Sequence, residues 1–337
     1  MILVTGGTGL VGSHLLLELV RLGRKPRAIY RHKDRIEVTK KVFSYYVDDH
    51  ELLFSSIKWV QCDILDVPKL EIAFDEISEV YHAAALISFD PTDDKTLLKV
   101  NVGGTANVAN LCIAHGVKKL CYVSSIAAIG PSVANEPIKE SNDWTETTGN
   151  GYALSKHLAE MEVWRASQEG VPVAIVNPGI ILGAGHWYSG SGKFFYAASK
   201  APKYYLPSGT GFVSVEDVVA AMLLVMDSEI KNERFILVSE NWTYKLLSEI
   251  IAEGLGKNPP KKEIKLWMLD LFWRLDWVRS KLFGKKRRLS KATAKVFEKR
   301  EYYDTTKLKK SLPAFEYQNL KKKIGEYATA FLKERAS

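Results

Sequence analysis

A glycine-rich stretch near the start of the chain reads Thr5-Gly6-Gly7-Thr8-Gly9-Leu10-Val11-Gly12. It lies between an apolar run at 2–4 and an apolar-periodic segment at 11–22, which predict a strand and a helix. In this context Gly6 allows a tight turn, Gly9 lets the backbone approach a pyrophosphate and Gly12 lets the helix pack closely. The stretch therefore predicts a dinucleotide-binding loop, although the same spacing alone also suits a plain turn. The expected contacts are Gly6, Thr8, Gly9, Leu10, Val11 and Gly12.

The segments that follow alternate short β-rich runs with helical ones, the pattern of a parallel sheet covered by helices on both faces. Further strands are expected at 26–30, 58–62, 79–84, 119–124, 173–176 and 235–238. Helices are expected at 104–115 and 152–168, with one more inside 34–57. The predicted fold class is α/β: a doubly wound Rossmann sheet with a smaller mixed C-terminal domain.

Two segments, 183–211 and 241–337, do not follow the strand–helix rhythm and are rich in aromatic residues and lysines. We expect residues 1–176 and 212–240 to form the dinucleotide-binding domain. Residues 177–211 and 241–337 are then expected to form a smaller substrate-binding domain.

The bulk properties are those of an ordinary folded protein. The 337 residues are 46% hydrophobic and 26% charged, and no apolar run is long enough to span a bilayer. The first predicted strand follows Met1 directly, which leaves no room for a signal peptide. Cys62, Cys112 and Cys121 lie far apart, and the seven histidines are scattered. We therefore expect a cytoplasmic protein with no integral membrane segment and no metal site.

The net charge of +8 is concentrated toward the C-terminal end, where residues 285–337 contain sixteen Lys and Arg against six Asp and Glu. Such a segment can bind nucleic acid or an anionic membrane surface. However, the lysines at 321–323 stand beside Ile324, Tyr327 and Phe331 at helical spacing, which favours a solvated helix face. We expect no nucleic-acid partner.

The end of the second predicted strand bears on the choice of cofactor. An acidic residue there would hydrogen-bond the ribose 2′-hydroxyl of NAD, but this chain has Arg31, followed by His32 and Lys33. The planar guanidinium of Arg31 suits the 2′-phosphate of NADP. The sequence therefore favours NADP(H) over NAD(H), although Arg31 is also consistent with an exposed strand end.

Two further strand ends face the expected dinucleotide. Asp63, followed by Ile64, ends the third strand, where a carboxylate can accept a hydrogen bond from the adenine amino group, or can instead cap the next helix. The fourth strand ends in small side chains that would let the backbone lie against the dinucleotide. They are Ala83, Ala84 and Ala85.

Tyr152 and Lys156 begin the longest predicted helix, four residues apart and therefore on one face. A tyrosine with its ordinary pKa of about 10 is a poor general base at neutral pH, and a neighbouring ammonium lowers that pKa. Ser124 and Ser125 end the fifth strand, where a hydroxyl can hydrogen-bond a substrate oxygen. A Tyr-x-x-x-Lys pair by itself is common by chance.

Together these residues resemble the short-chain dehydrogenase/reductases, specifically the extended or atypical branch. The resemblance covers roughly residues 1–249, and the segment 303–308 is similar to the family's C-terminal pattern. It rests on an ordered set of motifs: the glycine loop, Asp63-Ile64, His82-Ala83-Ala84-Ala85, Asn101-Val102-Gly103-Gly104-Thr105, Ser125, Tyr152, Lys156 and Asn177-Pro178-Gly179.

The resemblance implies a role for each matched residue. Tyr152 would donate or take the proton at the substrate oxygen, Lys156 would bind the nicotinamide ribose, and Ser125 would orient the carbonyl. Ser125 rather than Ser124 matches the catalytic serine because Gly130 follows it five residues later. A homodimer through the helices at 104–115 and 152–168 is also implied. The remaining implied cofactor contacts are Asn101, Ser124, Asn177, Pro178, Gly179 and Ile180.

Two kinds of enzyme in this family fit the sequence: carbonyl reductases similar to dihydroflavonol reductase or hydroxysteroid dehydrogenase, and nucleotide-sugar epimerases or dehydratases. Arg31 suits NADPH, Ile126 stands beside Ser125 where sugar-nucleotide enzymes often carry Thr, and no arginine lies between 189 and 213 to clamp a diphosphate. We expect reduction of a ketone or aldehyde of a hydrophobic small molecule, with the epimerase as the alternative. A silent nucleotide-binding protein is a third hypothesis, which the intact catalytic residues argue against.

The expected substrate wall is apolar and aromatic, which suits a hydrophobic carbonyl compound better than a sugar diphosphate. Aromatic side chains also fill cores, and about half of this set is expected to do so. The expected substrate contacts are Phe89, Ile126, Trp187 and Phe194, and the wider set adds Trp144, Tyr188, Phe195, Tyr204 and Tyr205.

One aromatic segment is not assigned to the dinucleotide site or to the substrate wall. Residues 266–278 read LWMLDLFWRLDWV, and a basic run follows at 285–288. This composition suits a helix on a membrane surface or a lid over an apolar substrate. A helix packed inside the smaller domain is the commoner explanation.

Overall fold

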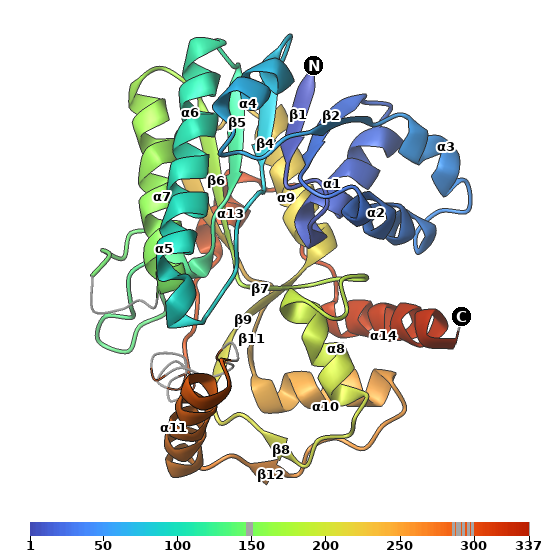
Figure 1. The fold of residues 1–337 in the computed structure, drawn as a ribbon, viewed down its shortest axis with the longest axis vertical. Helices are drawn as coiled ribbons and strands as arrows, with labels where there is room; N and C mark the ends of the chain where they lie inside the picture. Colours follow the sequence, from blue (N-terminus) through green and yellow to red (C-terminus); the bar gives the residue numbers. More distant parts are fainter. Residues whose placement is uncertain are drawn as a thin grey trace.

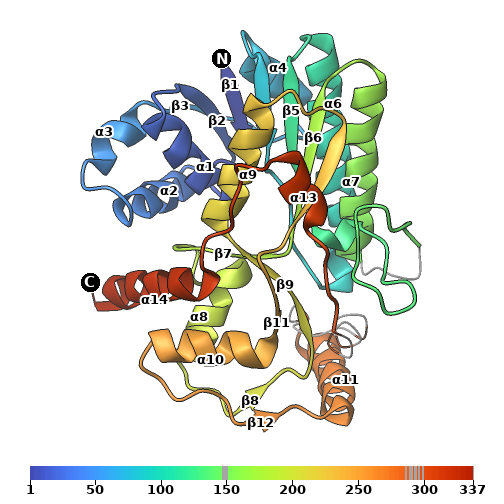
Figure 2. The same cartoon turned by 180° about the vertical axis from the view of Figure 1, so that it is seen from behind.

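The computed structural model describes residues 1–145, 151–284, 287, 291, 294, 297 and 300–336. Its larger lobe is built on a seven-stranded sheet in the order β10-β6-β5-β4-β1-β2-β3, in which every pairing is parallel (Figures 1 and 2). This doubly wound order confirms the predicted fold class. The strands are β1 (Ile2–Thr5), β2 (Pro26–Tyr30), β3 (Lys58–Gln61), β4 (Glu79–His82), β5 (Lys119–Val123), β6 (Val173–Pro178) and β10 (Glu233–Leu237).

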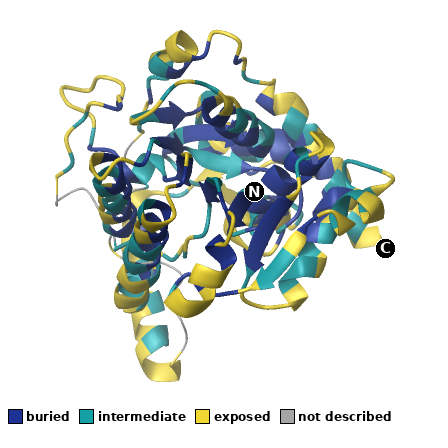
Figure 3. Cartoon of the chain, turned by 90° about the horizontal axis from the view of Figure 1, so that it is seen from above, coloured by how far each residue is buried: buried dark blue, intermediate teal, exposed yellow. Residues whose placement is uncertain are grey.

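Helices cover both faces of this sheet, and alternate residues of each strand point into two separate cores. In β5, for example, Cys121 and Val123 join one core while Leu120 and Tyr122 join the other. Figure 3 shows the buried strands at the centre, between helices whose outer faces are exposed. One face carries α1 (Leu10–Arg21), α2 (Asp34–Ser44) and α9 (Val215–Asp227), and the other carries α4 (Val67–Phe74), α6 (Gly104–Ala114) and α7 (Gly151–Gln168).

The extra helix expected inside 34–57 is confirmed as α2, and a second short helix, α3 (His50–Ser55), follows it in the same segment. Residues 45–49 separate the two helices. A further irregularity precedes α6: α5 (Asp94–Leu97) continues into a π-helical turn at Leu98–Gly103.

The smaller lobe contains a three-stranded sheet, β11-β9-β7, and a two-stranded sheet, β12-β8. Its helices α8, α10 and α14 enclose a core of their own. The bounds are β7 (Ile180–Leu182), β8 (Tyr204–Tyr205), β9 (Gly209–Ser214), β11 (Glu240–Thr243), β12 (Lys262–Glu263), α8 (Lys193–Ala198), α10 (Tyr244–Gly254), α11 (Leu266–Phe283) and α14 (Leu320–Ala336). The short helix α13 (Thr306–Ser311) returns to the larger lobe, where Leu308 is buried.

The amphipathic helix expected near the C-terminal end is confirmed. Ile324, Tyr327 and Phe331 of α14 are buried in the core of the smaller lobe, and Lys321 and Lys322 remain exposed. The boundaries of the two predicted domains stay a prediction. Strand β9 runs from the smaller sheet directly into α9, which packs on the larger sheet. Within the described residues, no helix combines the length and apolar character needed to cross a membrane.

Candidate active site

The glycine loop joins β1 to α1 as expected. Gly6 has a positive φ of 70°, and a side chain there would meet the backbone nitrogen of Ala84 at 2.6 Å. A Cβ at Gly12 would lie 2.1 Å from the carbonyl oxygen of Gly6, so α1 begins in close contact with the turn. The loop therefore needs glycine at both positions for its own geometry.

The start of α1 is open toward solvent. Gly9 is the N-cap residue, and no side chain caps the helix. A Cβ at Gly9 would meet only the Gly6 carbonyl oxygen, at 3.3 Å. Thr8, Leu10 and Val11 are partly exposed around it. Free N–H groups and the positive end of the helix dipole thus lie beside an unfilled backbone surface, which fits a dinucleotide pyrophosphate.

A pocket of about 350 Å³ lies at the ends of β2 and β3, where the ribose and adenine of a dinucleotide would lie. Arg31 and Asp63 both line it, with the nearest guanidinium and carboxylate atoms 3.9 Å apart and both side chains substantially exposed. The Asp63 carboxylate also accepts a hydrogen bond from the backbone N–H of Leu65. The alternative role of Asp63 as a helix cap was wrong, because Asp66 caps α4 through the N–H of Lys69. The adjacent Ile64 is buried.

The structure brings together two of the three predicted catalytic side chains through a direct contact. Ser125 and Tyr152, from the end of β5 and the start of α7, are hydrogen-bonded through their side chains. Burial raises the pKa of Tyr152, and the hydrogen bond with Ser125 lowers it in part. The expected lowering of the Tyr152 pKa below its ordinary value is therefore not found in this structure.

Lys156 lies one turn further along α7 and is almost completely buried. Its Nζ atom donates hydrogen bonds to the Tyr122 hydroxyl at 2.7 Å and to the Val123 carbonyl oxygen at 2.9 Å. The same ammonium lies 4.4 Å from the centre of the Tyr122 ring. Burial lowers the pKa of Lys156 to about 7, against an opposing effect of Glu160. The lysine is therefore held beside β5 and titrates near neutral pH.

The side chain of Glu160 connects the helix and strands that support this site. Its buried carboxylate accepts hydrogen bonds from Ser124 at 2.7 Å and from the Asn177 side chain at 2.9 Å. It also forms a 2.8 Å ion pair with Arg234 of β10. Asn177 in turn donates to the carbonyl oxygen of Ser125. One carboxylate therefore links α7, β5, β6 and β10.

A second buried network extends from the lysine across the sheet. His82 contacts the hydroxyl groups of Thr5 at 2.6 Å and Thr105 at 2.9 Å. Its ring also stacks on Tyr122, with 5.3 Å between centroids. Burial lowers the pKa of His82 to about 3, so the imidazole is neutral at physiological pH. The residues that support Lys156 are thus packed and hydrogen-bonded in turn.

Asn101 lies in the π-helical turn and clamps the chain after β4. Its side chain exchanges hydrogen bonds with the backbone of Leu86 and donates a third to Ser155 of α7. Its structural effect is to hold the segment after Ala85 against α7. The remaining predicted cofactor residues at this edge lie at the end of β6, where Pro178 closes the strand and Gly179 and Ile180 turn into β7.

The predicted substrate residues divide into two groups. The Phe89 ring is 50% exposed and lies 5.6 Å from the ring of Tyr152, and Ile126 directly follows Ser125. Trp187 and Phe194, however, belong to the core of the smaller lobe. Trp187 is only 2% exposed and donates a hydrogen bond to Glu334, and Phe194 packs on Tyr244. The structure therefore does not bring Trp187 to the surface around Tyr152.

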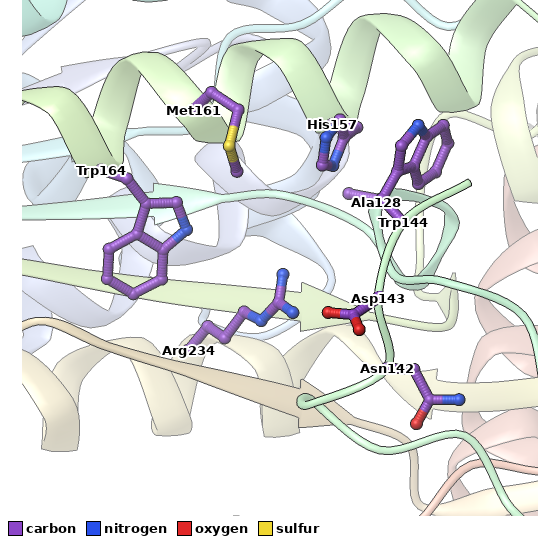
Figure 4. Close-up of a pocket in the computed structure, with 8 residues that line it drawn as sticks. All are labelled: Ala128, Asn142, Asp143, Trp144, His157, Met161, Trp164 and Arg234. Carbon is purple, nitrogen blue, oxygen red and sulfur yellow. The ribbon is translucent and has the colours of Figure 1, made fainter. Parts of the chain in front are cut away.

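Trp144 also lies elsewhere. It stacks on His157 with 4.5 Å between ring centroids, in a separate pocket of about 340 Å³. Figure 4 shows this pocket between α7, β10 and the segment that contains Trp144, with Arg234 reaching across its floor. His157, Met161 and Trp164 line it from a face of α7 adjacent to the one that carries Lys156 and Glu160.

Sequence reasoning missed three supporting residues: Tyr122, Glu160 and Arg234. The sequence contained enough information to identify Glu160. Tyr152, Lys156 and Glu160 recur every four residues and therefore share one helix face. A carboxylate on a face expected to be buried calls for a cationic or donor partner. The partners themselves come from β5 and β10, and no local spacing predicts them.

Comparison with known proteins decides the family. The model for the NAD dependent epimerase/dehydratase family matches residues 2–237. This chain belongs to that family. It is therefore an NAD(P)-dependent enzyme of the extended short-chain dehydrogenase/reductase type, as the ordered motifs predicted.

Several named proteins are similar to this chain over most of their length. A sterol demethylase protein B of Methylococcus capsulatus is 28% identical over 269 residues, covering 78% of this chain and 76% of the relative. A putative dihydroflavonol 4-reductase of Synechocystis sp. is 28% identical over 317 residues, covering 90% and 87%. A 3 beta-hydroxysteroid dehydrogenase/Delta 5-->4-isomerase of Vaccinia virus is 27% identical over 315 residues, covering 87% of each chain.

Solved structures of the family share the whole architecture. The crystal structure of gox2253 superposes with a TM-score of 0.79 at 25% identity and covers 99% of this chain and 98% of that one. The UDP-glucose 4-epimerase of Thermotoga maritima superposes with a TM-score of 0.75 at 22% identity, covering 99% of each chain. The latter likeness concerns the fold alone.

Proposed function

We propose that this family member is an NADP-dependent reductase of a ketone or aldehyde in a hydrophobic small molecule. The observation that carries the proposal is the hydrogen-bonded Ser125–Tyr152 pair beside the half-exposed aromatic ring of Phe89. A proton donor and an orienting hydroxyl next to an apolar surface suit a carbonyl flanked by hydrocarbon.

The proposed reaction assigns one task to each residue. Bound NADPH would supply the hydride that the carbonyl carbon accepts, and would be oxidised to NADP⁺. The Tyr152 phenol gives its proton to the carbonyl oxygen, so that an alcohol forms, and the Ser125 hydroxyl stabilises the negative charge on that oxygen. Lys156 contacts the nicotinamide ribose and favours the phenolate that remains on Tyr152. In the oxidative direction, Tyr152 takes the proton instead.

Preference for NADP is supported by charge at the end of β2. Arg31 lines the pocket together with His32 and Lys69, so three basic side chains surround the expected position of the 2′-phosphate. Asp63 and Asp66 line the same pocket, where they pair with Arg31 and Lys69 and balance their charges, so the support for NADP comes from the planar, exposed guanidinium of Arg31. We therefore expect a preference for NADPH, with NADH retained as a weaker cofactor.

The relatives lend support in the same direction, since they include a putative dihydroflavonol 4-reductase and a 3 beta-hydroxysteroid dehydrogenase/Delta 5-->4-isomerase. The alternative is a nucleotide-sugar epimerase, which the likeness to UDP-glucose 4-epimerase keeps open at the level of the fold. An epimerase would carry tightly bound NAD and act on a sugar diphosphate.

Two further properties belong to the proposal. A cytoplasmic location is supported by Cys62, Cys112 and Cys121, which are free and buried, as in a reducing compartment. A homodimer through α6 and α7 is supported by Leu158 and Met161, apolar residues that remain more than one-third exposed on α7. A monomeric mass in sizing with light scattering would contradict the dimer.

The experiment that tests the proposal is a fluorescence titration of the purified protein with NADPH and with NADH. We expect tighter binding of NADPH, with the preference lost in Arg31→Ala and kept in Arg21→Ala, a control on the far end of α1. Oxidation of NADPH in the presence of hydrophobic ketones or aldehydes then completes the test. NAD retained through purification, or turnover of a nucleotide sugar, would favour the epimerase instead.

A further inference from the structure

Helix α11 presents an apolar surface to solvent. It spans Leu266–Phe283 and lies at the outer edge of the smaller lobe, beside β8 and β12 (Figures 1 and 2). Leu269 is its only buried residue, and Trp273, Asp276 and Ser280 follow it on the same face at intermediate exposure. This spacing of three to four residues identifies the side of the helix that contacts the protein.

The opposite side of α11 is apolar as well. Five large hydrophobic residues recur there at helical spacing and are between 42% and 72% exposed: Trp267, Leu271, Leu275, Val278 and Leu282. A surface helix of an ordinary globular protein carries polar residues on this side. A continuous exposed stripe of this kind marks an interaction surface. We call these five residues the α11 stripe.

Positive charge surrounds the α11 stripe. Between Lys261 and Arg288 the sequence contains ten Lys and Arg against three Asp and Glu. Lys265 and Lys281 are exposed, and the Lys281 ammonium lies 4.7 Å from the centre of the Trp277 ring. Arg274 is paired with Asp270, and Arg279 with Asp276, so the excess comes from the lysines and from the run at 285–288.

We propose that α11 lies on the surface of an anionic lipid bilayer, with the α11 stripe inserted among the acyl chains and the cations at the phosphates. An exposed row of Trp and Leu flanked by lysines suits the boundary between headgroups and hydrocarbon, where Trp is favoured. The surrounding cations supply the charge that attracts anionic lipid. They also oppose pairing of two copies through this helix, because such a pair would bring two strongly positive surfaces together.

Arg287, four residues beyond the end of α11, contacts the chain near Tyr152. The backbone N–H of Arg287 donates a 2.8 Å hydrogen bond to the buried carboxylate of Asp90. Asp90 directly follows Phe89, whose ring contacts Tyr152. The chain beyond α11 therefore contacts the residue next to Phe89 of the proposed active site. The docking itself does not depend on the proposed activity.

Vesicle co-sedimentation tests the proposal directly. The full-length protein is mixed with vesicles of phosphatidylcholine alone, or of phosphatidylcholine with phosphatidylserine, at low and at high salt. We expect binding to the anionic vesicles that weakens with salt. Leu271→Glu with Leu275→Glu should reduce this binding about tenfold or more, because two inserted side chains are lost. Lys265→Glu with Lys281→Glu should weaken it and shift its salt dependence.

Two matched controls keep the result interpretable. Leu52→Glu and Ile72→Glu change apolar residues that are 69% and 70% exposed on α3 and α4 of the larger lobe, and these variants should bind vesicles like the wild type. Thermal melting and NADPH titration check that each variant is folded. The proposal is overturned if the wild type stays in solution with anionic vesicles at low salt, or if the α11 variant binds them equally well. It is also overturned if light scattering finds a dimer that the α11 substitutions dissociate while vesicles bind neither protein.

Discussion

The Nζ atom of Lys156 donates a 2.7 Å hydrogen bond to the hydroxyl of Tyr122. Tyr122 lies on β5 three residues before Ser125, which follows the end of the strand, so the strand that leads to the proposed orienting hydroxyl also positions the lysine. The ring of Tyr122 is fixed in turn by stacking on His82. The position of Lys156 is thus set by β5 as well as by its own helix.

Removal of the Tyr122 hydroxyl is expected to impair catalysis more than stability. In Tyr122→Phe the lysine keeps only its bond to the Val123 carbonyl, and loss of an acceptor lowers the pKa of Lys156 further. We expect kcat to fall about tenfold, with the lysine-dependent limb of the pH–rate profile moved to lower pH. Tyr81→Phe is the matched control, because the buried Tyr81 hydroxyl on the neighbouring strand has no hydrogen-bond partner in the structure. Equal pH–rate profiles for Tyr122→Phe and the wild type would contradict this role.

Loss of the Tyr152 hydroxyl should abolish turnover while cofactor binding persists. Tyr152→Phe keeps the ring contact with Phe89 but removes the proposed proton donor, and kcat is expected to fall by about 10² to 10⁴. Tyr302→Phe, at an exposed position, should leave kcat unchanged. NADPH affinity, measured by fluorescence, should remain near the wild-type value in both variants. A Tyr152→Phe enzyme with wild-type turnover would instead support the silent nucleotide-binding protein.

Replacement of the buried lysine by an apolar residue should stabilise the unliganded protein in a pH-dependent manner. The pKa of Lys156 is lowered from 10.5 to about 7 in the folded state, so the unfolded chain binds more protons between these values. The stability that Lys156 costs is therefore largest below about pH 7 and diminishes toward about pH 10. Lys156→Met should raise Tm by several degrees in mild acid and by less in mild alkali. Lys245→Met, at a half-exposed site, should show neither effect, and a Tm gain independent of pH would contradict the assignment.

The Glu160 carboxylate should matter for both stability and catalysis. Glu160→Gln leaves the Arg234 guanidinium without its buried counter-charge and weakens the bonds to Ser124 and Asn177. We expect a loss of about 2 to 3 kcal/mol in the free energy of unfolding, measured by urea denaturation, together with a lower kcat. Glu162→Gln breaks an exposed pair with Arg165 and should cost about 0.5 kcal/mol or less. Similar losses for the two variants would argue against the network.

Substitutions in the glycine loop can distinguish an effect on cofactor binding from an effect on folding. Gly9 has φ −94° and ψ 176°, which alanine adopts readily, and its Cβ would meet only one atom, at 3.3 Å. Gly9→Ala should therefore keep Tm near the wild-type value but weaken NADPH binding about tenfold, because the methyl group fills the surface where the pyrophosphate approaches. Gly12→Ala should lower Tm, since its Cβ would collide with Gly6. Unchanged NADPH affinity in Gly9→Ala would place the pyrophosphate elsewhere.

The parts of this molecule that follow from local pattern were predictable. The central strands and the two long helices of the larger lobe fall within a few residues of their expected bounds, because each combines a clear apolar period with glycine or turn residues at its ends. The order of motifs also identified the family. The short helix α3, which follows the expected helix in the same segment, was not predicted.

Contacts between distant segments were not predictable in the same way. The partner of Lys156 lies 34 residues away on another strand, and Arg234 lies 74 residues from Glu160. Trp187 was expected at the substrate wall, but its indole is satisfied by Glu334, 147 residues further along the chain. Aromatic composition alone does not distinguish a core residue from a wall residue. Likewise, the α11 stripe can be recognised as an exposed apolar surface only when the side of α11 that contacts the protein is known.

The junction between β6 and β7 has a consequence for how such an enzyme can change over time. Gly179 lies between a strand of the larger sheet and one of the smaller sheet, and a Cβ there would lie 2.4 Å from the carbonyl oxygen of Gly211 in β9. The smaller lobe is thus anchored, at close backbone contact, two residues from Asn177, which holds Ser125. Mutations that reshape the outer segments of that lobe leave this anchor and the proton-transfer geometry in place. A lineage can therefore acquire new substrates by altering the periphery while it inherits the same reaction unchanged.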